Sequence, residues 1–179
     1  MEFVFYAVLF IVTVLLVANF VQLLIYPPLE IQPADLPEVV QQELKNCFPN
    51  FRPAGIKLLR PRQRYLMNGK ISDTPSRVLV DLTPDQELVK VEFSDDSGPS
   101  RFSNKRPIPT TTVPPQISAA IRKYLPATLA TGKDSTAFSG MIGSEQAYQI
   151  KIHSDEFDYE FEITQAGRLV GFEKVHPHA

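Results

Sequence analysis

Apolar and polar residues alternate along two stretches of this chain that are far apart. Residues 77–83 alternate, apart from the apolar Leu79 on the polar side, and residues 88–93 repeat the pattern after a Pro-Asp turn signal. Residues 158–164 alternate in the same way, and residues 168–175 follow after a turn that contains a glycine. A period of two with one apolar side is typical of antiparallel strands that bury one face. The pattern therefore predicts two β-hairpins.

A short helix is predicted before each hairpin. Pro37 and Pro49 enclose a segment with apolar residues at helical spacing, and Pro114 and Pro126 enclose another. The two prolines are twelve residues apart in each segment, and the segments are 77 residues apart. A proline at the first helical position costs no hydrogen bond, so Pro37 and Pro114 suit helix starts.

The two halves of the chain look like copies of one unit. Thr83 aligns with Thr164 and Glu92 with Glu173, at an offset of 81 residues that leaves about four extra residues between helix and hairpin in the second copy. Further strands are expected at residues 56–60, 63–67 and 146–153, with an Asn68-Gly69 turn after the second of these. The expected fold class is α+β, with two repeated units that each pack one helix on a small antiparallel sheet.

A membrane anchor is predicted ahead of the first unit. Residues 3–25 carry no charge and would extend roughly 34 Å as a helix, at about 1.5 Å per residue, which exceeds a hydrocarbon core of about 30 Å. Met1-Glu2-Phe3 is unlike the basic start of a cleaved signal peptide, so an uncleaved signal anchor is expected. We expect a single-pass protein of the inner cell membrane, with its folded part outside the cytoplasm.

These patterns divide the chain into segments with distinct roles. Residues 94–115 are rich in Ser, Pro and Thr, without a hydrophobic period, which indicates a linker. The expected division is an anchor (1–26), a tether (27–35), a first unit (36–94), a linker (95–112), a second unit (113–176) and a tail (177–179).

Charge and cysteine content narrow the possible functions. The chain has 18 Lys and Arg against 20 Asp and Glu, so it lacks the basic excess of a nucleic-acid-binding domain. Cys47 is the single cysteine and lies on an apolar helix face, which favours a small buried residue over a reactive thiol.

One run of basic residues is the leading candidate for a contact site. It contains no acidic residue from position 54 to position 71, and it could contact an acidic partner or anionic lipid, or simply be a solvated strand edge. The residues of this basic run are Lys57, Arg60, Arg62, Arg64 and Lys70.

Other polar groups give weaker signals. The acidic run of Asp155, Glu156, Asp158, Glu160 and Glu162 is spread along a strand and is interpreted as a solvent-facing surface. The histidines at 153, 176 and 178 could hold a metal only weakly, and we expect a frayed tail instead. No arrangement of nucleophile, base and orienting group is evident, so no catalytic, cofactor or metal site is predicted.

The repeated unit resembles a known family. The segments 36–49 and 78–83, with their counterparts 113–126 and 159–168, resemble the PepSY-like group, including the tandem beta-lactamase-inhibitor-like domains. That resemblance implies a non-enzymatic module of the bacterial envelope that binds or restrains peptidases or other proteins. We therefore expect a membrane-anchored binding module for a protein or peptide partner, the alternative being a structural or assembly subunit of a membrane complex.

Overall fold

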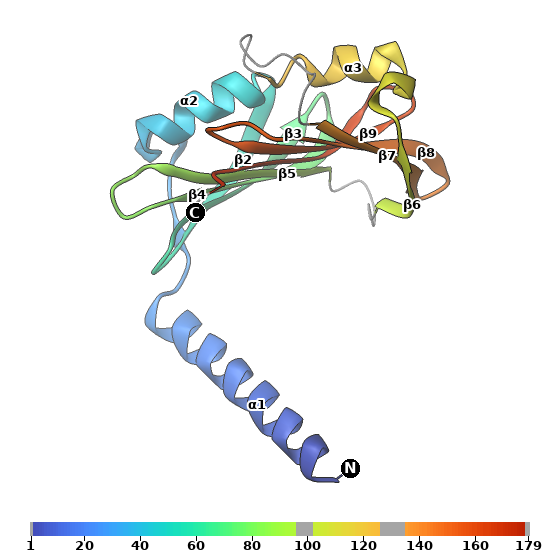
Figure 1. The fold of residues 1–179 in the computed structure, drawn as a ribbon. Helices are drawn as coiled ribbons and strands as arrows, with labels where there is room; N and C mark the ends of the chain where they lie inside the picture. Colours follow the sequence, from blue (N-terminus) through green and yellow to red (C-terminus); the bar gives the residue numbers. More distant parts are fainter. Residues whose placement is uncertain (1, 96–101, 126–134, 178–179) are drawn as a thin grey trace.

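Ten antiparallel strands form one continuous sheet in the computed structural model, which describes residues 2–95, 102–125 and 135–177 (Figure 1). The strands lie in the order β1-β2-β3-β4-β5-β10-β9-β8-β7-β6. In chain order the elements are α1 (Glu2–Ile25), β1 (Leu29–Glu30), a 3₁₀ turn (Pro33–Asp35), α2 (Glu38–Cys47), β2 (Phe51–Leu59), β3 (Gln63–Ile71), β4 (Thr74–Leu82), β5 (Leu88–Asp95), β6 (Phe102–Ile108), a second 3₁₀ turn (Thr110–Thr112), α3 (Pro115–Ile121), β7 (Ser135–Ile142), β8 (Glu145–Ile152), β9 (Asp158–Thr164) and β10 (Leu169–Val175).

The predicted fold class of two helix-on-sheet units behind an anchor is wrong. The same order of elements does occur twice, as a strand, a 3₁₀ turn, a helix and four strands. The two sets of strands nevertheless join into one sheet, because β5 of the first set pairs with β10 of the second from Lys90–Val175 to Ser94–Gly171. Pairing of this kind removes the open edge that each small sheet would otherwise expose.

One hydrophobic core also serves both halves. Helices α2 and α3 lie on the same side of the sheet (Figure 1). Phe48, at the end of α2, stacks on Phe93 of β5 at 5.1 Å between ring centroids and meets Phe172 of β10 edge-on at 5.6 Å. Tyr124, after α3, packs against Phe172 at 6.2 Å. A helix from each half therefore covers the β5–β10 junction between the halves, which we call the seam.

Ion pairs cross the same seam. The ammonium nitrogen of Lys174 on β10 lies 3.1 Å from both carboxylate oxygens of Glu43 on α2. At the other end of the seam, Arg168 donates to the buried carboxylate of Asp95 on β5. Salt bridges as well as hydrophobic packing therefore hold the two halves together.

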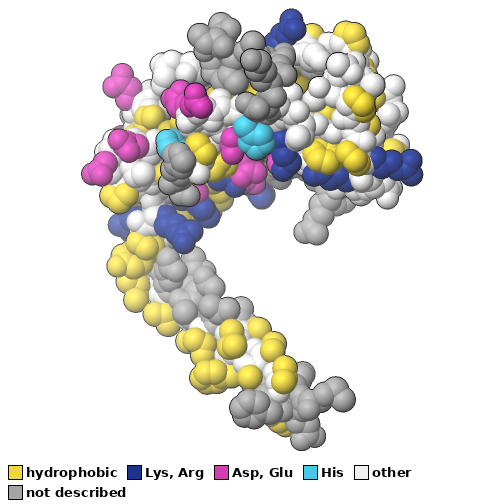
Figure 2. All heavy atoms as spheres, viewed as in Figure 1, with side chains coloured by type: hydrophobic (Ala, Val, Ile, Leu, Met, Phe, Trp, Pro, Cys, Tyr) yellow, Lys and Arg dark blue, Asp and Glu magenta, His cyan; other side chains and the backbone are white. Residues whose placement is uncertain are grey.

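The apolar N-terminal stretch forms the helix α1, but the predicted membrane anchor is corrected. Large apolar side chains on its described part are exposed, among them Val8, Phe10 and Ile11 (Figure 2). Within the part of the chain that the structure describes, no helix is both long and apolar enough to cross a bilayer. This finding overturns the transmembrane anchor at 1–26, the signal-anchor assignment and the single-pass inner-membrane localisation.

Regular structure also occurs in the segments interpreted as tether and linker. Residues 29–30 form β1, and residues 102–108 form β6, which pairs with β7 at the edge of the sheet. Residues 96–101, near the start of the expected linker, lie outside the described residues.

Candidate functional site

The basic run does not form a single site. Lys57, Arg60 and Arg62 are exposed on β2 and the following turn, whereas Lys70 is exposed towards the opposite end of β3. Arg64 is held by Asp81 of β4, with Nε 2.6 Å from Oδ1 and Nη2 2.7 Å from Oδ2. Within the described ranges, the other four basic side chains of the run form no salt bridge. In Figure 2 a group of Lys and Arg side chains lies where the body of the protein meets α1.

The acidic residues of β9, by contrast, lie together with carboxylates from other strands. Glu160 of β9 is paired in register with Glu173 of β10, which is itself paired with Glu92 of β5. These side chains point to the face of the sheet opposite α2 and α3, because their neighbours Phe93, Phe161 and Phe172 enter the core.

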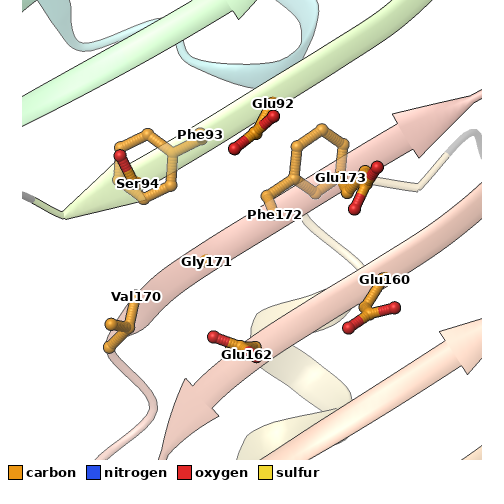
Figure 3. A pocket seen from close by; sticks show the side chains of 9 residues that line it. All are labelled: Glu92, Phe93, Ser94, Glu160, Glu162, Val170, Gly171, Phe172 and Glu173. Atoms are coloured by element: carbon orange, nitrogen blue, oxygen red, sulfur yellow. The ribbon is translucent and has the colours of Figure 1, made fainter. Parts of the chain in front are cut away.

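The centre of this face is hollowed into a shallow depression of about 210 Å³. Gly171 and Ser94 face each other across the seam and leave little side-chain bulk, so the surrounding carboxylates stand around a low floor (Figure 3). We call this feature the central depression, and its polar rim consists of Glu92, Glu160, Glu162, Glu173 and Ser94.

Two of the carboxylates occupy equivalent positions in the two halves. Glu92 and Glu173 are 81 residues apart, the same offset as between the two hairpin turns, and they are direct cross-strand partners. Like charges in this position repel one another. Lys90 offsets the repulsion, because its Nζ lies 3.0 Å from Glu92 Oε2 and 2.7 Å from Glu173 Oε1. Burial lowers the pKa of Lys90, but its hydrogen bonds to Glu173 and Glu92 outweigh that effect, so the net pKa lies above the ordinary value.

The other two carboxylates share a glutamine. Gln149 of β8 donates through Nε2 to Glu160 Oε1 at 2.5 Å and to Glu162 Oε1 at 3.1 Å. Lys151 pairs with Glu160 at 2.5 Å. Burial raises the pKa of Glu162, and the adjacent Glu160 raises it further, although the hydrogen bond from Gln149 and the charges of Lys105 and Lys151 act in the opposite direction.

Gln149 is itself incompletely bonded. Its side chain lies on the face opposite α2 and α3, which we call the open face, but is only 6% exposed, and its buried Oε1 atom has no hydrogen-bond donor among the described residues. A buried acceptor without a partner costs free energy on the order of 1–3 kcal/mol. The amide end of Gln149 is therefore an unfilled acceptor next to two carboxylates of the central depression.

The remaining candidates lie outside this site. His153 pairs with Asp158 at 2.9 Å, His176 packs edge-on against Phe157, and the histidine at 178 lies beyond the described residues. Over the described ranges no group of His, Cys, Asp and Glu could hold a metal ion. Cys47 is buried, as its place on the apolar helix face predicted, and burial raises its thiol pKa to about 12. A thiol with that pKa stays protonated and unreactive near neutral pH.

The central depression was missed by sequence reasoning, although a signal for it was present. The alignment of Glu92 with Glu173 was recognised, but the pairing of β5 with β10 was not, and only that pairing brings the two residues together. Chemically, the site offers anionic oxygens to a cationic or hydrogen-bond-donating group.

Comparison with protein-family models, curated proteins and solved structures found no match to this chain.

Proposed function

We propose that this protein is a non-enzymatic binding module that docks a protein or peptide partner on the face of its sheet opposite α2 and α3. The observation that supports the proposal is that α2 and α3 cover one side of the ten-stranded sheet, while the other side carries polar and half-buried residues along its whole width. The resemblance to PepSY-like domains supports the same class of function, with a peptidase as one possible partner.

The size of the open face suits a protein partner. Nine of the strands have seven to nine residues. With strands about 4.8 Å apart and a rise of about 3.3 Å per residue, these nine strands present roughly 1,000 Å². A typical specific interface buries about 800 Å² on each partner. The open face is therefore large enough for one complete interface.

The chemical character of the face also suits docking. Leu66 of β3 and Leu79 of β4 are cross-strand partners on the open face and are half-buried there, beside the Arg64–Asp81 pair. The central depression begins on the adjacent strand β5, at Glu92, which is the cross-strand partner of Leu79. An apolar patch bordered by charged groups is the usual composition of a non-obligate protein interface.

Site-specific photocrosslinking tests this proposal. A photoreactive amino acid is introduced at Leu79 or Thr136 on the open face, and at Glu38 or Gln116 on the helix-bearing side as a control. Partners that crosslink in cells are identified, purified and titrated against the protein and its Leu79→Arg variant. We expect crosslinks at the open-face positions and at least tenfold weaker binding by the variant. Crosslinks confined to the helix-bearing side would refute the proposal.

Co-purification separates a binding module from the alternative, a structural or assembly subunit of a membrane complex. A partner that co-purifies in a fixed ratio through several columns would assign the protein to an assembly role. A partner that is captured transiently and dissociates on dilution fits the binding module.

A further inference from the structure

We infer that the segment which docks on the open face is basic and inserts a Lys or Arg side chain into the central depression. The inference rests on the proposed function and adds the chemistry of the partner. Three features of the described residues support it, namely the charge balance, the size of the depression and the arrangement of carboxylates around it.

The charge balance of the site favours a cation. Four carboxylates surround the central depression, whereas three ammonium groups act on them within the described residues, two through salt bridges and Lys105 through its charge on Glu162 alone. Lys90 is shared between Glu92 and Glu173, and Lys151 pairs with Glu160. Glu162 has a neutral partner, Gln149, and no salt bridge with any described residue. An incoming cation would supply the charge that the site lacks.

The size of the depression limits the group that fits. Its 210 Å³ is about seven times the roughly 30 Å³ occupied by one liquid water molecule. Pockets for drug-sized ligands start at about 300 Å³. The space therefore suits the end of one long side chain better than a separate small molecule.

The geometry of the rim favours a group with several donors. Carboxylates approach the depression from three adjacent strands, β5, β10 and β9. A guanidinium carries five N–H donors in a planar fork and forms paired hydrogen bonds with carboxylates, so Arg suits the rim better than Lys.

The basic run on β2 and β3 does not compete for this site within one chain. Strand β4 lies between β3 and β5, which forms the nearest wall of the depression. Arg64 on β3 already forms a salt bridge with Asp81. The cation must therefore come from the docked segment.

Peptide titration with the full chain tests the inference. Three fluorescein-labelled decapeptides are used as probes, with alternating Arg and Thr, alternating Gln and Thr, or alternating Glu and Thr. Fluorescence anisotropy at low ionic strength reports their dissociation constants. We expect the Arg–Thr peptide to bind at least tenfold more tightly than the other two.

Matched variants show where the peptide binds. The double variant Glu162→Gln/Glu173→Gln removes two charges from the central depression, and Glu38→Gln/Glu87→Gln removes two exposed charges elsewhere. We expect the first double variant to weaken binding of the Arg–Thr peptide at least tenfold, and the second to weaken it less than twofold. Gly171→Val fills the depression without changing charge, and we expect it to weaken binding as well. A Cβ at residue 171 would meet Glu162 Oε2 at 3.0 Å, and that flexible carboxylate can move.

The possible results separate this inference from the proposed function. Equal losses in the two double variants, or no loss in Gly171→Val, would overturn the inference. Binding of the Gln–Thr peptide that Leu79→Arg abolishes would overturn the inference while leaving the proposed function intact. The absence of binding by all three peptides at millimolar concentration, together with open-face positions that do not crosslink, would overturn both.

Discussion

The ion pair between Lys174 and Glu43 gives a quantitative test of how the two halves are joined. It links β10 of the second half to α2 of the first, and the side chains are only 11% and 14% exposed. The Lys174 ammonium also lies 4.1 Å from the centroid of the Phe157 ring. Lys174→Met keeps most of the packed hydrocarbon but leaves the Glu43 carboxylate with the Cys47 thiol, 3.6 Å away, as its remaining polar partner among the described residues.

The expected loss follows from the burial of that carboxylate. Removing one partner of a buried ion pair costs about 3–5 kcal/mol, and the slight exposure of Glu43 places this case near 3 kcal/mol. Replacing both residues, as in Glu43→Met/Lys174→Met, removes the unpaired charge. We therefore expect the double variant to lie within about 1 kcal/mol of the parent protein.

Urea denaturation followed by circular dichroism measures these changes in the free energy of unfolding. Lys90→Met is the matched control, because it breaks ion pairs whose carboxylate side chains are 48% and 40% exposed, and should cost at most about 1 kcal/mol. A loss below 1 kcal/mol in Lys174→Met, or a double variant as unstable as the sum of the single ones, would refute the reasoning.

Three further predictions concern single positions. Gln86 occupies the turn position that Gly167 occupies 81 residues later, and both have positive φ, +64° and +85°. Gln86→Gly should therefore raise the free energy of unfolding by about 0.5–1 kcal/mol, and Gly167→Ala should lower it by about 1 kcal/mol, as measured by urea titration. A Cβ at Gly69 would lie 2.2 Å from the backbone oxygen of Arg52, so Gly69→Ala should lower the thermal midpoint by several degrees, whereas an unchanged midpoint would contradict that contact. The pKa of Cys47 rises from 9.0 to about 12 on folding. The protonated thiol therefore makes its full contribution to the free energy of unfolding below pH 9, and this contribution is lost as the pH rises from 9 to 12. Cys47→Val should flatten part of the fall in stability across that range, and an unchanged pH profile would argue against it.

Strands with one solvent-exposed and one buried face were predictable from the sequence. The hairpins expected at 77–93 and 158–175 correspond to β4–β5 and β9–β10 within a few residues, since their alternation reflects one face in the core. The edge strand β6 was not predictable in this way. Most of its residues are exposed on both faces, so no apolar period marks it, and its Ser, Asn, Pro and Lys residues look like a linker.

The turn predicted at Asn68-Gly69 is wrong. Asn68-Gly69 was interpreted as a turn, yet β3 continues through it to Ile71, and the chain reverses at Ser72 and Asp73, both with positive φ. Gly69 is required because the backbone of Arg52 approaches too closely for any side chain. Local turn preference was outweighed by a long-range strand contact that single-sequence reasoning cannot detect.

The placement of β10 beside β5 has a consequence for synthesis on the ribosome. The first half leaves the exit tunnel with β5 complete, but the strand that covers its edge is translated more than 70 residues later. During that interval β5 exposes unsatisfied backbone donors and acceptors, which invite pairing with a neighbouring nascent chain. Termination after β6 should therefore yield an aggregating product, and the full polypeptide gains protection only when its last strand emerges.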